Sequence, residues 1–255
     1  MNVGQCDDSD RLRGALVGAA LGEILARSGN GTDAPDVATL ERRLRADRWP
    51  LGPGMQAALE VGDQVAQADL GSLPPPRHLH RTGDELNLLP VLPVALTGAF
   101  RPNVIRQRAA ALFAHAPPET AEAAIAFALL VAALFDGDRL TALDEAAEAA
   151  PAAVGMAMRS APLEDADRVI ARQEPTRSLV AGVWSFYQAD GVVEALLIAA
   201  RTGAGGVCGG VSGALAGTWW GLRGIPKELA GKVADPGPIT LGERLARLLA
   251  GATNR

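Results

Sequence analysis

The side chains that could supply acid–base or metal chemistry are few and loosely grouped. A single residue separates His78 from His80, and Asp84 and Glu85 follow them closely. Two histidines at this spacing could begin a metal site, but no third ligand is evident nearby and Arg81 follows directly. Adjacent carboxylates in a polar loop are usually solvated. We therefore interpret both pairs as loop residues.

A glycine-rich turn is a second candidate. Gly203, Ala204, Gly205 and Gly206 precede a predicted helix, and free N–H groups at a helix start can bind an anion. No predicted strand precedes this turn and no lysine follows it closely, so it is not a nucleotide-binding P-loop. Cys208 has no histidine nearby in the sequence. It is better explained as a small packing residue than as a nucleophile.

The composition disfavours several classes of function. The chain has 255 residues, of which 48% are hydrophobic, and its formal net charge is −5. Because no block of lysine or arginine could neutralise phosphates, we expect no nucleic-acid partner. The acidic N-terminus does not resemble a signal peptide, and Cys6 and Cys208 match no zinc spacing. These features predict a cytoplasmic protein.

Two apolar segments have some features of membrane spans. Residues 123–135 form an unbroken apolar run, but this run is shorter than the roughly 20 residues that a bilayer requires. Residues 203–222 carry no charge, yet most of them are glycine, alanine, serine or threonine, which gives little drive for insertion. We predict that both segments are buried helices and that the protein does not associate with a membrane.

Helical patterns dominate the chain, and strand signals are weak because aromatic residues make up only 4%. The first predicted helix follows the N-capping residues Asp7, Asp8 and Ser9 and covers residues 10–27. Because no long linker or internal repeat is present, we predict one all-α domain spanning residues 1–255. The other predicted helices cover residues 37–46, 55–66, 104–113, 118–135, 140–149, 177–188, 191–200, 207–220, 227–230 and 241–249.

Two of these helices carry glycine at every fourth position, which places the glycines on one helical face. Glycine costs up to about 1 kcal/mol relative to alanine inside a helix, so the repeated glycines need a reason. Tight helix packing in the centre of the fold is the favoured explanation, and room for a ligand at the helix ends is the alternative. The residues are Gly14, Gly18 and Gly22 in the first stripe, and Gly205, Gly209, Gly213 and Gly217 in the second.

Residues 10–23 read DRLRGALVGAALGE, residues 114–134 read AHAPPETAEAAIAFALLVAAL, and residues 183–229 contain GALAG followed by Ile-Pro. These stretches resemble, in the same order, three segments of the ADP-ribosylglycohydrolase family. The resemblance implies that family's compact orthogonal helical bundle. It also implies an active site with two magnesium ions, which bind the ribose hydroxyls and position water to cleave an ADP-ribosyl bond.

The metal ligands that the resemblance implies are missing from the corresponding positions. The family's Thr-Asp-Asp motif falls on residues 50–52, which are Pro-Leu-Gly. Its GGDTDT loop falls on residues 202–207, where the two aspartates become Ala204 and Gly206. The Gly-Asp pair that usually ends the opening helix becomes Gly-Glu, which keeps one carboxylate at Glu23.

This loss does not depend on the alignment, because residues 48–59 and 195–227 contain no aspartate or glutamate. Magnesium prefers carboxylate and other hard oxygen ligands, so we predict that the family's magnesium site is lost and that the protein has no cofactor. Glu23 is a candidate catalytic residue. The ligand-binding cleft predicted from the mapping consists of Glu23, Gly52, Asp84, Gly203, Ala204, Gly205 and Gly206.

Three functions remain open. The missing carboxylates favour a catalytically inactive relative of the ADP-ribosylglycohydrolases, which binds a protein partner or an ADP-ribose-like ligand. The second is an active ADP-ribosyl hydrolase with a metal-independent site that uses Glu23, Asp84 and Glu85. The third is a structural or assembly role, since fold alone does not imply function.

Overall fold

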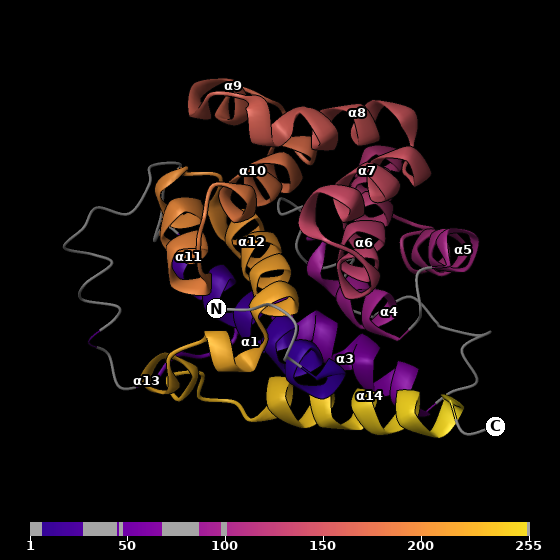
Figure 1. Ribbon diagram of the computed structural model, residues 1–255, viewed down its shortest axis with the longest axis vertical. Helices are drawn as coiled ribbons and strands as arrows, with labels where there is room; N and C mark the ends of the chain where they lie inside the picture. The colour runs from indigo at the N-terminus through magenta and orange to yellow at the C-terminus, as the bar shows by residue number, and fades with distance from the viewer. Residues whose placement is uncertain (1–6, 28–44, 46–47, 68–86, 98–100, 254–255) are drawn as a thin grey trace.

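The computed structural model describes residues 7–27, 45, 48–67, 87–97 and 101–253 (Figure 1). Within these ranges the chain is helical without any β-strand, and Trp49 and Val233 form an isolated parallel β-bridge. The predicted all-α fold is therefore confirmed. The α-helices are α1 (Asp8–Ala26), α3 (Pro53–Gln67), α4 (Leu92–Leu96), α5 (Pro102–Leu112), α6 (Pro118–Asp136), α7 (Arg139–Ala149), α8 (Ala152–Ser160), α9 (Ala166–Ile170), α10 (Thr176–Tyr187), α11 (Val192–Arg201), α12 (Gly205–Trp220), α13 (Lys227–Ala230) and α14 (Gly237–Thr253). Short 3₁₀ turns are η2 (Leu89–Val91), η3 (Ala161–Leu163) and η4 (Leu222–Gly224).

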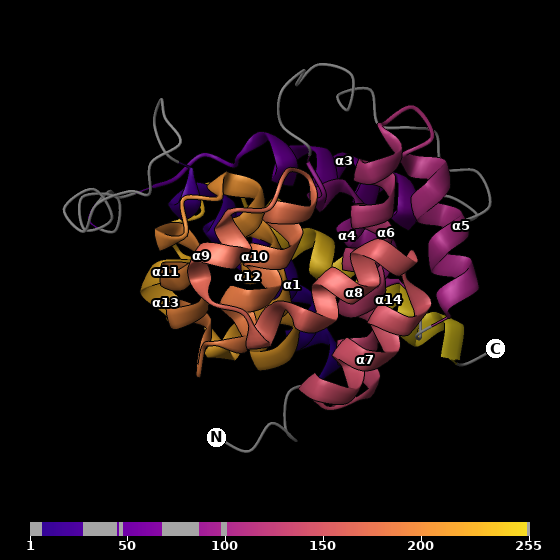
Figure 2. The same cartoon turned by 90° about the horizontal axis from the view of Figure 1, so that it is seen from above.

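Helices α1 and α12 lie side by side through the centre of the molecule (Figures 1 and 2). A β-carbon on Gly18 would lie 2.2 Å from the carbonyl oxygen of Gly213, and one on Gly22 would lie 1.9 Å from that of Gly209. Any larger residue would push the helices apart, because their backbones are in direct contact. The packing explanation is therefore confirmed for these glycines. Gly205, at the start of α12, differs because a β-carbon there would meet nothing within 4 Å.

Helix α6 is the apolar run recognised in the sequence. Residues 123–134 are almost completely buried. By length and composition, α6 is the one helix in the described ranges that could cross a membrane. The apolar segment that meets this test is Pro118–Phe135, and 67% of it is buried inside the protein. Its contacts with α4, α5, α7 and α12 account for its apolar composition.

Arg11 ties α1 to the ends of two other helices. Its guanidinium donates to the carbonyl oxygens of Thr218 at 2.8 Å and Phe135 at 3.1 Å, and also to that of Leu134. It lies 4.7 Å from the centroid of the Phe135 ring. Carbonyls at a helix C-terminus lack partners within the helix and carry partial negative charge, so the half-buried Arg11 stabilises both α6 and α12.

The predicted helix boundaries agree with the structure to within a few residues for most elements. Helix α1 begins after Asp7, whose carboxylate accepts from the Asp10 amide at 2.6 Å, as the capping signal predicts. The helix predicted at residues 37–46 lies outside the described residues except for position 45. Helices α4, α8 and α9 were not predicted, because they are short and give too few turns of hydrophobic periodicity.

Candidate functional site

Glu23, near the C-terminal end of α1, is the centre of the mapped site. Its side chain is 2% exposed. One carboxylate oxygen accepts from the Gly54 amide and the other from the Met55 amide, each at 2.8 Å. These are among the first amides of α3, which have no partner within their own helix. Glu23 therefore caps the N-terminus of α3, where the helix dipole also favours a negative charge.

The residues at the start of α3 require an external cap. Pro53, the first helical residue, has no N–H group, and Gly52 before it has no side chain that could accept from the first turn. A β-carbon at Gly52 would lie 2.3 to 2.6 Å from the carboxylate of Glu23. The volume that a side chain at position 52 would need is thus occupied by Glu23.

The segment before α3 is held by a contact with the chain between α13 and α14. The Trp49 amide donates to the Lys232 carbonyl at 2.7 Å, and the Ala234 amide donates to the Trp49 carbonyl at 3.0 Å. Leu51 is buried and its carbonyl accepts from the side-chain amide of Gln56 at 3.2 Å. This anchoring fixes the position of Gly52 relative to Glu23.

The glycine-rich turn before α12 forms another side of the same centre. A β-carbon on Gly206 would lie 3.4 Å from Cγ of Glu23 and 2.7 Å from Cγ of Arg27. The structure therefore brings Glu23, Gly52 and Gly206 together, although they are far apart in the sequence. The mapping onto three separate segments had placed all three in one cleft.

The conformation of the turn explains two of its glycines. Gly203 and Gly205 have φ angles of 69° and 80°, in the left-handed region that glycine adopts at low cost. Thr202 Oγ1 accepts from the Ala204 amide at 3.3 Å, and the Ala204 carbonyl accepts from Ser178 Oγ at 3.4 Å. Ala204, the N-cap residue of α12, offers no side-chain acceptor to the first amides of that helix.

Cys208 is a packing residue. Its side chain is fully buried, and burial raises the pKa of its thiol to about 12, while a hydrogen bond with Thr202 acts in the opposite direction. The Thr202 Oγ1 to Cys208 Sγ distance is 3.6 Å. A nucleophilic cysteine needs a lowered pKa and access to substrate, and Cys208 has neither.

Asn87 is a polar neighbour of the centre that the sequence analysis did not select. It is 7% exposed, and a β-carbon on Gly54 would lie 2.4 Å from its Nδ2 atom. Its Oδ1 accepts from the Leu89 amide at 3.2 Å. Asp84 and Glu85, and the histidines at 78 and 80, lie outside the described residues, so the structure does not place them.

Comparison with known proteins identifies the family. The ADP-ribosylglycohydrolase family profile matches residues 23–255. The fold is similar to a solved structure titled "ADP-ribosylglycohydrolase-related protein complex", with a TM-score of 0.70, 21% identity, and coverage of 95% of this chain and 99% of that chain. No curated protein sequence matches significantly. At this identity the solved structure supports the fold, and the family match covers most of the chain. The chain belongs to the ADP-ribosylglycohydrolase family.

Proposed function

We propose that this protein is a catalytically inactive member of its family, which acts in the cytoplasm by binding an ADP-ribose-like ligand or a protein partner. The observation that carries the proposal is the role of Glu23. The carboxylate that Glu23 retains at the end of the opening helix accepts hydrogen bonds through both oxygens from the amides of Gly54 and Met55. It maintains the fold at the place where the family performs chemistry.

The residues at this centre do not fit the magnesium pair that the family implies. Magnesium binds hard oxygen ligands, and carboxylates are needed to offset the cost of removing its water shell. Gly52, Ala204, Gly206 and Val207 offer no side-chain oxygen at the mapped positions. Within the described ranges, no group of three or more histidine, cysteine, aspartate or glutamate side chains could hold a metal ion.

Glu23 is also unsuited to metal-independent catalysis. A general acid or base must exchange a proton with the substrate or with water. Both oxygens of Glu23 accept hydrogen bonds from buried amides, so protonating this carboxylate would weaken the hydrogen bonds at the N-terminus of α3. A group in this position would have to break its own helix cap in order to react.

The glycine turn supports retention of a binding role. Gly205 faces open space, and the N-terminus of α12 presents amides without a side-chain cap from Ala204. Such amides favour an anionic group. The solved structure of similar fold is described by its title as a protein complex, and this favours a protein partner as the second form of binding.

The experiment is a hydrolysis assay on peptides that carry ADP-ribose on arginine or serine, with and without magnesium. We expect no ADP-ribose release by the wild-type protein above the level of a Glu23→Gln variant. Circular dichroism verifies that the variant is folded. Turnover by the wild-type protein that is lost in Glu23→Gln would contradict the proposal and support the metal-independent hydrolase.

A further inference from the structure

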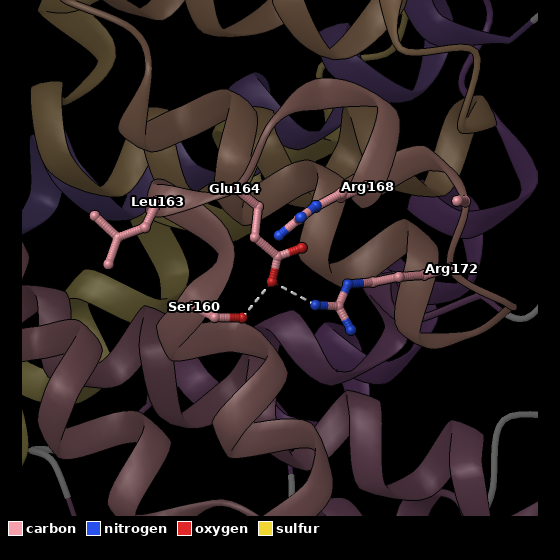
Figure 3. A pocket seen from close by; sticks show the side chains of 6 residues that line it. Ser160, Leu163, Glu164, Arg168 and Arg172 are labelled. Carbon is pink, nitrogen blue, oxygen red and sulfur yellow. Dashed lines mark hydrogen bonds and ion pairs between the residues drawn. The ribbon is translucent and has the colours of Figure 1, made fainter.

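A pocket of about 540 Å³ lies on the part of the molecule formed by α8, η3 and α9 (Figure 3). None of its lining residues belongs to the centre around Glu23. The proposed function of the Glu23 centre does not involve this pocket. The lining residues are Ser160, Leu163, Glu164, Arg168, Ala171 and Arg172.

A hydrogen-bonded group holds one side of this pocket in place. Ser160 Oγ donates to Oε1 of Glu164, and Arg172 Nη2 lies 2.5 Å from the same oxygen (Figure 3). The hydrogen bond from Ser160, together with Arg172, lowers the pKa of Glu164 despite the opposing effect of burial. The Glu164 backbone carbonyl accepts from the Trp184 indole at 3.0 Å, which ties the pocket to α10.

The pocket carries an excess of positive charge. Arg172 is balanced by Glu164, but Arg168 forms no ion pair with any residue in the described ranges. The buried Nε–H group of Arg172 also lacks an acceptor there. Asp165 and Asp167 are close in sequence, but neither lines the pocket. Two guanidinium groups facing one carboxylate favour an added anion, and guanidinium binds phosphate and carboxylate especially well.

The pocket also has an apolar part, because Leu163 and Ala171 line it. Leu163 is 90% exposed, the highest value among the large hydrophobic side chains in the described ranges. It points away from the Glu164–Arg172 pair in Figure 3, and Ala171 is also exposed. An exposed leucine stabilises a complex only when a ligand covers it, so this side of the pocket favours an apolar group.

We propose that this pocket binds a ligand in which a phosphate or carboxylate group is attached to an apolar group. The anion contacts Arg168 and Arg172, and the apolar part covers Leu163 and Ala171. Ser160 and Glu164 hold the guanidinium of Arg172 in position. This inference does not depend on the proposed function of the Glu23 centre.

The experiment is an NMR titration of the full chain with phenyl phosphate, phenylacetate and inorganic phosphate at physiological ionic strength. We expect saturable shifts of the Leu163 methyl and Ala171 signals with at least one of the two phenyl compounds. The phenyl compound that binds more tightly identifies phosphate or carboxylate as the preferred anion. Inorganic phosphate is expected to bind more weakly than phenyl phosphate because it leaves Leu163 and Ala171 uncovered.

Matched variants separate the two parts of the pocket. Arg168→Gln removes an exposed guanidinium that forms no close ion pair within the described ranges, and should weaken binding by about fivefold. Arg106→Gln, an exposed arginine on α5, is the control and should leave it unchanged. Leu163→Ser should weaken the binding of the two phenyl compounds but not the binding of inorganic phosphate. The proposal is overturned if neither phenyl compound shifts these signals, or if Arg168→Gln binds as tightly as the wild-type protein.

Discussion

Replacing Glu23 with glutamine should destabilise the protein although it changes neither the size nor the shape of the side chain. The carboxylate accepts two hydrogen bonds at 2.8 Å from the amides of Gly54 and Met55. A glutamine side chain keeps one acceptor oxygen, but its NH₂ group meets the second amide, donor facing donor. One amide at the start of α3 therefore loses its partner in a buried position.

The expected size follows from these two contacts. A hydrogen bond to a charged group contributes about 1.5 to 3 kcal/mol, and a helix cap about 1 kcal/mol. Loss of the charge at the helix N-terminus adds to this, while relief of the cost of burying the charge offsets part of it. We expect Glu23→Gln to lower the free energy of unfolding by about 2 kcal/mol. Glu23→Ala, which also leaves a cavity, should lower it by about 4 kcal/mol.

Urea unfolding followed by circular dichroism measures this change. In a chain of this length, 2 kcal/mol corresponds to a fall in Tm of roughly 4 to 8 °C. The matched control is Glu145→Gln on the exposed face of α7, which should change the free energy of unfolding by less than about 0.5 kcal/mol. A Glu23→Gln variant as stable as Glu145→Gln would refute the capping role.

Three further predictions concern packing, reactivity and ionisation. Gly18→Ala should destabilise the protein by about 3 kcal/mol in urea unfolding, because the new β-carbon would lie 2.2 Å from a backbone oxygen of α12. In a Cys6→Ser background, Cys208 should react with a thiol reagent at pH 8 only after denaturant is added, because its pKa of about 12 keeps the buried thiol protonated. Ser160→Ala should raise the pKa of Glu164, measured by NMR titration of the carboxyl, because the hydrogen bond that lowers it is lost. The lowered pKa stabilises the folded state above the ordinary glutamate pKa, and this contribution disappears as the pH falls through the folded value, so the variant should lose less stability on acidification.

A specific experimental result would contradict each of these three predictions. Gly137→Ala is the control for Gly18→Ala, because its β-carbon would meet only ordinary contacts at 3.8 Å or more, and equal stability of the two variants would contradict the packing account. Rapid labelling of Cys208 in the folded protein would show that it is accessible. An unchanged Glu164 titration in Ser160→Ala would show that the hydroxyl does not stabilise the carboxylate.

Much of the fold was predictable from the sequence because its signals are local. The cap at Asp7 acts on an amide three residues away, and the four-residue glycine spacing places Gly14, Gly18 and Gly22 on one helical face. Packing between two such faces follows from the absence of β-carbons. Short helices such as α8 and α9 lack these signals, because their stability comes from contacts with α7 and α10.

The site was only partly predictable. The mapping identified Glu23, Gly52 and Gly206 as members of one cleft, and the structure brings them together. It did not predict that Glu23 is bound to the amides of Gly54 and Met55, 31 and 32 residues away, because no local pattern marks a long-range helix cap. Likewise, no local pattern in the sequence marks the ion pair of Glu164 with Arg172, so the pocket that contains this pair was not predicted.

The measurement that tests the central claim most directly is a calorimetric titration of the full chain with magnesium, in the presence and absence of ADP-ribose. If Glu23 is a helix cap and the mapped ligands are lost, neither the wild-type protein nor Glu23→Gln should show saturable magnesium binding in the micromolar range. Micromolar magnesium binding by the wild-type protein that is lost in Glu23→Gln would show that Glu23 serves as a metal ligand, and would contradict the account.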